Sequence, residues 1–315
     1  MSATTDFVAA QNQNRRNTMV LLAVLTALAA LVGYLVGALL EGESSGSLPA
    51  VSQLGIAGAG LMAAASVGWS AISLAVGDRM VLSMAGAKAI EKQDAPQLYN
   101  VVEEISIAAG VPMPRVMVLE TDALNAFATG NRIGNGTIAV TRGLLNTLSR
   151  DELQGVVAHE MAHLRNLDTR YMVVVGVTVG LIALVCDMAL RTMNWGRMRS
   201  DDRKGSSGGG ILIIVLLVVA ILAPLAAKAV QMAVSRQREY LADATSVQFT
   251  RNPNGLISAL GKLAEKAAPF PGVSRATQHL FIVNPINQFT SKTPALLATH
   301  PDIADRIARL RNLGA

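Results

Sequence analysis

Cysteine is nearly absent from this chain: Cys186 is the only one in 315 residues. With no second cysteine to pair with, an intramolecular disulfide is excluded. Charged residues are also few, at 16%, whereas hydrophobic residues make up 51% and the mean hydropathy is +0.39. This balance is richer in apolar residues than that of an ordinary soluble protein and favours a membrane protein.

A block of basic residues is also missing, although the net charge is +5 and the pI is about 9.6. The lysines and arginines are scattered through the expected loops and helix ends. This scatter argues against a nucleic-acid partner. It favours a cytoplasmic face that is attracted to the anionic lipid of a bilayer.

Two long runs lack any ionisable residue, about 19–40 and 54–76. Each reaches the roughly 20 residues that a helix needs to cross the hydrocarbon core. Spans without ionisable residues argue against a transporter.

Two shorter apolar runs, 172–186 and 211–227, are predicted as a third and fourth membrane segment. Small residues of the second span permit close helix contact: Gly55, Ala59, Gly60 and Ala64.

The distribution of charge around the first two runs predicts their orientation. Arg15 and Arg16 precede the first run, and the loop from Glu41 to Gln53 has no lysine or arginine. The positive-inside rule then places the N-terminus and the chain from about residue 79 in the cytoplasm. The basic connector between the shorter runs opposes a full crossing there. Those runs either cross fully or form a shallow hairpin on the cytoplasmic side.

The segment after the second run has the mixed polarity of a folded domain. Asp94 is a candidate N-cap for a helix that has Pro96 in its first turn and ends at Gly110. Strands are predicted at 116–119, 125–130 and 137–141, and Asn135-Gly136 indicates a hairpin between the last two. Ser149 and Glu152 form a capping box that starts another helix.

That last helix carries the sequence His159-Glu160-Met161-Ala162-His163. The i to i+4 spacing places both imidazoles on one helical face, where they can hold one metal ion. Glu160 can take a proton from an attacking water as a general base. With 4 histidines in the chain, such a motif arises by chance in roughly two of a thousand sequences, so an accidental pair is a poor explanation.

A catalytic zinc site needs a third protein ligand and an open position. Glu239 is the candidate, because Asp243 lies four residues later and can orient a ligating histidine. The alternative is an exposed Glu239 that pairs with Arg236 or Arg238. If the two shorter apolar runs form an antiparallel hairpin, both ligand helices emerge on one side, close above the membrane surface.

These motifs resemble the HtpX membrane metallopeptidases, relatives of the CAAX prenyl proteases within the gluzincins. The resemblance covers most of the chain and includes 125–130, 159–163, 235–243 and 299–307. It implies one zinc ion, held by His159, His163 and Glu239, and an edge strand that binds extended peptides, formed by Asn125, Ala126, Phe127, Ala128 and Thr129. It also places His300 and Arg306 near the site, where either could stabilise an oxyanion. A capping histidine and a surface arginine are the alternative interpretations.

The sequence therefore predicts an α+β, multi-span helical membrane protein with a mainly helical zincin-like catalytic domain and a small β-sheet. Residues 1–78 form the membrane anchor, 172–227 a hydrophobic hairpin, and 79–171 with 228–315 the cytoplasmic zinc metallopeptidase domain. The resemblance implies a stress-response endopeptidase of the cell inner membrane that removes misfolded or damaged membrane proteins. A metal-binding membrane chaperone or scaffold is the alternative, although it would have no need of Glu160.

Overall fold

The computed structural model describes residues 7–45, 51–130, 132, 134–169, 236–265 and 301–313. They fall into two compact units. One unit includes 15–45 and 51–72, and the other includes 7–14, 73–169, 236–265 and 301–313. The shorter apolar runs, 172–186 and 211–227, and His300 lie outside the described residues.

The first of these units is a pair of long helices, α1 (Phe7–Ser45) and α2 (Gln53–Met84), of which α2 continues into the other unit. Two stretches are long and apolar enough to cross a membrane, Leu22–Gly42 and Gln53–Ile72, in agreement with the two predicted spans. Glu41 of α1 is bonded to the start of α2, because its carboxylate accepts hydrogen bonds from Ser52 Oγ at 2.6 Å and Leu54 N at 2.8 Å. Multi-span character beyond these two helices remains a prediction.

Glycines allow α1 and α2 to approach closely. A Cβ on Gly33 would collide with the Gly58 carbonyl oxygen, and a Cβ on Gly37 with that of Leu54. Gly55 also lies at this contact, as the prediction of close helix packing requires. Gly60 does not, because nothing lies within 4 Å of a Cβ placed there. The small residues of α2 thus permit a close helix contact, as predicted, and Gly60 takes no part in it.

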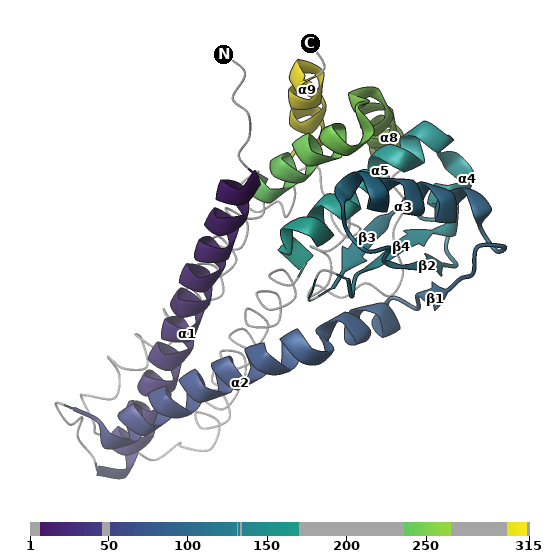
Figure 1. The fold of residues 1–315 in the computed structure, drawn as a ribbon. Helices are drawn as coiled ribbons and strands as arrows, with labels where there is room; N and C mark the ends of the chain where they lie inside the picture. Colours follow the sequence, from purple (N-terminus) through teal and green to yellow (C-terminus); the bar gives the residue numbers. More distant parts are fainter. Residues whose placement is uncertain are drawn as a thin grey trace. The chain divides into compact units, whose positions relative to one another are not determined.

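The other unit contains a four-stranded mixed sheet in the order β1-β2-β4-β3 (Figure 1). Its strands are β1 (Lys88–Ala89), β2 (Arg115–Leu119), β3 (Ala126–Thr129) and β4 (Thr137–Thr141). β2 and β4 are parallel, and the other two pairs are antiparallel. The hairpin predicted around Asn135-Gly136 is confirmed as β3 and β4, with Ala126 opposite Val140 and Thr129 opposite Thr137.

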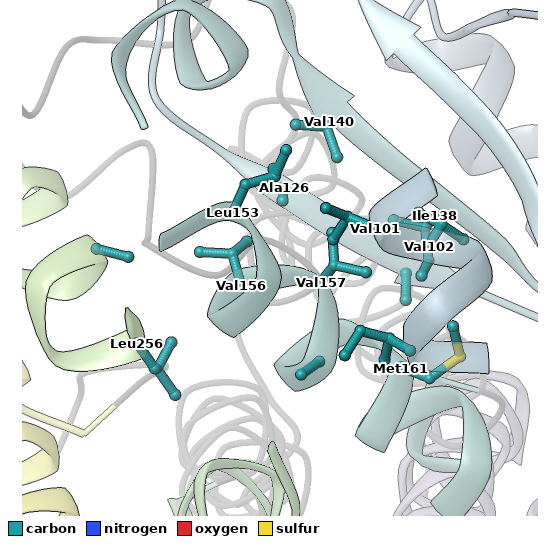
Figure 2. Packing of buried hydrophobic residues seen from close by; sticks show 14 of the residues in the cluster. Val101, Val102, Ala126, Ile138, Val140, Leu153, Val156, Val157, Met161 and Leu256 are labelled. Carbon is teal, nitrogen blue, oxygen red and sulfur yellow. The ribbon is translucent and has the colours of Figure 1, made fainter. Parts of the chain in front are cut away.

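The helices of this unit are α3 (Pro96–Ala109), α4 (Arg142–Thr147), α5 (Arg150–Asn166), α8 (Pro253–Glu265) and α9 (Ile303–Leu313). Residues 236–250 are also helical. Figure 2 shows the core, in which valines of α3 and α5 meet Ala126, Ile138 and Val140 of the sheet. Leu256 of α8 packs on the other side of α5. α5 is therefore buried between the sheet and α8, and nearly every residue from Leu153 to Leu164 is inaccessible to solvent.

The predicted helix starts were right for α5 and half right for α3. Ser149 Oγ accepts a hydrogen bond from Glu152 N, and the Glu152 carboxylate accepts one from Ser149 N at 2.7 Å, which confirms the capping box. In α3, Pro96 and the left-handed Gly110 lie as predicted. Asp94 as N-cap was wrong. The N-cap is Ala95 without a side-chain bond, because the Asp94 carboxylate accepts a hydrogen bond from Glu91 N instead.

Glu152 also joins α5 to α8, and this predicts a pH dependence of stability. Burial alone would raise its pKa, but hydrogen bonds from Lys262, Ser258 and the Ser149 N–H outweigh it and lower the pKa to about 2. A depressed carboxyl pKa stabilises the fold above the unfolded-state pKa of about 4.5, and the contribution is lost as the pH falls towards 2. Lys262 is 38% exposed, so solvent screening limits the contribution to about 2 kcal/mol.

The measurement is urea unfolding of the full chain in detergent between pH 5 and pH 2, beside Glu152→Gln. The difference in unfolding free energy between the two proteins should shrink as the pH falls through this window. A difference that does not change with pH would show that the Glu152 charge contributes nothing.

Gly155 sets how closely α5 and α8 approach. A Cβ at this position would lie 2.6 Å from Leu256 N and 2.9 Å from Leu256 Cα, which are backbone atoms that cannot rotate away. We expect Gly155→Ala to cost about 1–3 kcal/mol through overpacking. Gly261→Ala in α8 is the matched control, because nothing lies within 4 Å of its Cβ and the helix should gain about 1 kcal/mol. Equal gains in both variants, measured by urea unfolding, would contradict this packing.

Candidate metal centre

The metal centre is built on α5, where His159 and His163 lie one turn apart. They are 0% and 5% exposed, and their rings meet edge to face with centroids 4.8 Å apart. The two Nε2 atoms are 3.2 Å apart. The predicted pair therefore directs both nitrogens to one point.

The helical segment 236–250 brings Glu239 to the same point. Its Oε2 lies 3.5 Å from His159 Nε2, and its Oε1 lies 3.6 Å from His163 Nε2. Donor atoms from the three residues all lie within 4.8 Å of one another. Glu239 is 1% exposed, so the alternative of an exposed carboxylate on the surface of a helix was wrong.

Each histidine also meets a buried aspartate at its Nδ1. Asp243 Oδ1 lies 2.9 Å from His159 Nδ1, and Asp168 Oδ2 lies 3.1 Å from His163 Nδ1. Carboxylates that accept a hydrogen bond from Nδ1 leave the Nε2 lone pair for a metal. Asp243 thus lies where the sequence predicted it, whereas sequence analysis missed Asp168.

Asp168 lies beside His163 because of how α5 ends. The C-cap residue Leu167 adopts a left-handed conformation with φ of 58°, and this reverses the chain toward the last turn of the helix. A carboxylate five residues after the second histidine was the only signal in the sequence.

Arg306 of α9 is a buried part of the centre. It donates from Nε to Asp243 Oδ2 at 2.9 Å and from Nη2 to Asp243 Oδ1 at 2.7 Å, and its Nη1 lies 3.4 Å from Glu239 Oε2. It is 1% exposed, so the alternative of a surface arginine was wrong. Arg238, which sequence analysis considered only as a surface partner of Glu239, is equally buried, and its Nε lies 3.7 Å from Asp168 Oδ1.

The burial and the charges of this cluster shift the pKa values of its members. Burial and the Arg306 charge disfavour a protonated His159, but Asp243 and Glu239 outweigh them and raise its pKa to about 9. For Asp243, burial acts to raise the pKa, but Arg306 and His159 lower it. For Glu160, burial dominates and raises the pKa of the carboxyl, against the nearby histidines and a hydrogen bond from the Ala128 N–H.

The sheet edge next to Glu160 is β3, which within the described residues pairs only with β4. Thr141 N donates to the Asn125 carbonyl at 3.0 Å. In an antiparallel ladder, the residue pairs two and four positions further along β3 are then also joined by main-chain hydrogen bonds. The main-chain groups of Ala126 and Ala128 therefore face away from β4. All four residues of β3 are buried.

The three donors fit a zinc ion. Bonds of about 2.0–2.1 Å in a tetrahedral site separate the ligand atoms by about 3.3 Å. The two Nε2 atoms are 3.2 Å apart, and each lies 3.5 or 3.6 Å from one of the two Glu239 oxygens, Oε2 for His159 and Oε1 for His163. The cluster can therefore hold a metal ion.

Comparisons with known proteins agree with the resemblance seen in the sequence. The model of peptidase family M48 matches residues 92–314. A protein from Streptococcus thermophilus, called Protease HtpX homolog, is 41% identical over 307 residues, which are 96% of this chain and 98% of that relative. A protein of the same name from Thermoanaerobacter pseudethanolicus is 42% identical over 260 residues, 82% and 86% of the two chains.

Among solved structures, the crystal structure of S. mikatae Ste24p is similar. The TM-score is 0.44 and the identity is 19%, with 76% of this chain and 57% of that chain covered.

Proposed function

This chain belongs to peptidase family M48 and is a membrane-bound metallopeptidase, and we propose that it is a zinc-dependent endopeptidase with His159, His163 and Glu239 as ligands. The observation that carries the proposal is the trio of buried donor residues, whose ligand atoms all lie within 4.8 Å of one another, with Glu160 beside the first histidine. Asp243 orients His159 through its Nδ1.

When bound, zinc would polarise the scissile carbonyl and lower the pKa of a water molecule. Glu160 is the general base and then the acid. It takes a proton from the attacking water and later delivers it to the leaving amine. Burial raises its pKa above the ordinary carboxyl value, which suits a group that must accept and release a proton. The Ala128 N–H holds the carboxylate in place.

The substrate is an extended peptide that adds to the edge of β3 as a further strand. The outward main-chain groups of Ala126 and the Ala128 carbonyl are the hydrogen-bonding partners, because the Ala128 N–H is bonded to Glu160. Asn125, Phe127 and Thr129 complete the strand. Because β3 is buried, the protein must open at this edge to admit a peptide. His300 and Arg306 are both proposed as stabilisers of the oxyanion, and the support for this role is the sequence resemblance.

The substrates proposed are membrane proteins that are misfolded or damaged, in a quality-control task at the cell inner membrane. The two candidate spans and the arginines before the first support an anchor with the catalytic domain in the cytoplasm. The proposed division is 1–78 for the anchor, 79–171 with 228–315 for the catalytic domain, and 172–227 for a hairpin that makes the protein multi-pass.

Metal removal tests the function. We expect a strong chelator to abolish cleavage of an unfolded model protein by the full chain in detergent, and about one equivalent of zinc per chain to restore it, because Glu160 cannot hydrolyse an amide without the ion. The control is restoration with magnesium, which prefers six oxygen ligands and should fail. Full activity after the zinc content has fallen to zero would contradict the proposal.

A further inference from the structure

Two arginines are buried within the metal centre, and only one has a place in the mechanism proposed above. Arg306 and Arg238 are each 1% exposed and are the two largest fully buried side chains in the described part of the chain. A buried guanidinium is costly unless a carboxylate compensates it. Arg306 is compensated by Asp243, which holds His159. Arg238 faces Asp168, which holds His163.

We propose that Asp168 and Arg238 are a positioning pair that sets the His163 ring and joins it to the helix that carries Glu239. The proposal deepens the zinc-site assignment and rests on it. Each ligating histidine then has the same support: a carboxylate at Nδ1 and an arginine behind that carboxylate. Neither residue of the pair touches the reacting atoms, so their role is exerted through His163 and Glu239.

The first step is the tautomer of His163. Asp168 Oδ2 lies 3.1 Å from Nδ1 and accepts a hydrogen bond from the ring N–H. The Nε2 lone pair is then directed at Glu239 and His159. Asp168 is 1% exposed, so its charge needs a buried partner, and Arg238 Nε at 3.7 Å supplies one.

The second step is the connection between elements. Asp168 follows the left-handed turn at the end of α5, whereas Arg238 directly precedes Glu239 in the helical segment 236–250. The ion pair therefore anchors the third ligand's own backbone to the end of the helix that carries the first two ligands. Loss of the pair should loosen both the His163 ring and the approach of Glu239.

The experiment measures zinc affinity of the full chain in detergent by competition with a chromogenic chelator. The variants are Asp168→Asn, Arg238→Gln and the double variant, which removes both charges together and avoids an isolated buried ion. Arg236→Gln is the matched control, a partly exposed arginine two residues from Arg238 in the same helical segment. The visible spectrum of the cobalt-substituted protein reports ligand geometry without any activity measurement.

We expect the double variant to bind zinc about 10- to 100-fold more weakly and to give an altered cobalt spectrum. Arg236→Gln should stay within about twofold of wild type, because Arg236 makes no contact with the centre. Arg238→Lys keeps the positive charge but lacks the planar guanidinium, so it should bind zinc more tightly than Arg238→Gln and more weakly than wild type.

An unchanged affinity and cobalt spectrum in the double variant would overturn the inference. So would a double variant that fails to fold while Arg236→Gln folds, since the pair would then be structural only. Wild-type protein that binds no zinc would instead contradict the proposed function itself.

Discussion

We expect Glu160→Gln to lower the rate of peptide hydrolysis by about 10²- to 10⁴-fold while zinc affinity stays close to that of wild type. The amide has the size of the carboxylate but cannot accept the proton of the attacking water. Glu160 is not one of the three donors that surround the metal position, so its neutralisation leaves the ligand set intact. Its side chain remains in the same buried pocket next to Ala128.

The measurement is kcat/KM on a model substrate, with zinc content determined on the same sample. Glu103→Gln is the control, because it makes the same chemical change on an exposed part of α3 that contacts only Lys92. Activity within a few fold of wild type would remove Glu160 from the mechanism. Loss of both zinc and activity in Glu160→Gln would show a structural role for Glu160. If the protein is a scaffold that binds metal without turnover, wild type and Glu160→Gln would not differ in activity.

The sequence predicted the central residues of the site because helical periodicity is a local property. His159 and His163 must share a face wherever their helix lies, and so must Glu239 and Asp243. That these two helical segments meet is a tertiary fact, and the prediction of it rested on an assumed hairpin of the two shorter apolar runs and on the family resemblance. The role of Asp168 was not predicted, because its position depends on the left-handed turn at Leu167. No residue in that stretch requires this conformation.

The same distinction separates the strands that were predicted from the one that was missed. Asn135-Gly136 marked the β3–β4 hairpin by its composition, although the left-handed residue described in this loop is Gly134 and not the Asn-Gly pair itself. β1 is only two residues long and exists because Lys88 and Ala89 lie against Val118 and Met117 of β2. Nothing in Lys88-Ala89 itself has the alternation of a strand, so only the folded sheet reveals it.

Arg306→Leu is the second large effect that we expect, a loss of about 3–5 kcal/mol in the free energy of unfolding. Three guanidinium nitrogens are already committed to carboxylates: Nε and Nη2 to Asp243, and Nη1 toward Glu239. Leucine would leave two buried carboxylates without this cation. His159 would lose the support of a fixed Asp243, so zinc affinity should fall as well.

The measurement is urea unfolding of the metal-free full chain in detergent, followed by circular dichroism, with zinc affinity and kcat/KM determined in parallel. Arg311→Leu is the control, because it removes an exposed arginine from the same helix and should change stability by about 0.5 kcal/mol or less. A variant with wild-type stability and zinc affinity but a depressed kcat would reverse this view. Arg306 would then act only on the oxyanion, the role proposed for it above, and its contacts with Asp243 and Glu239 would serve to aim it.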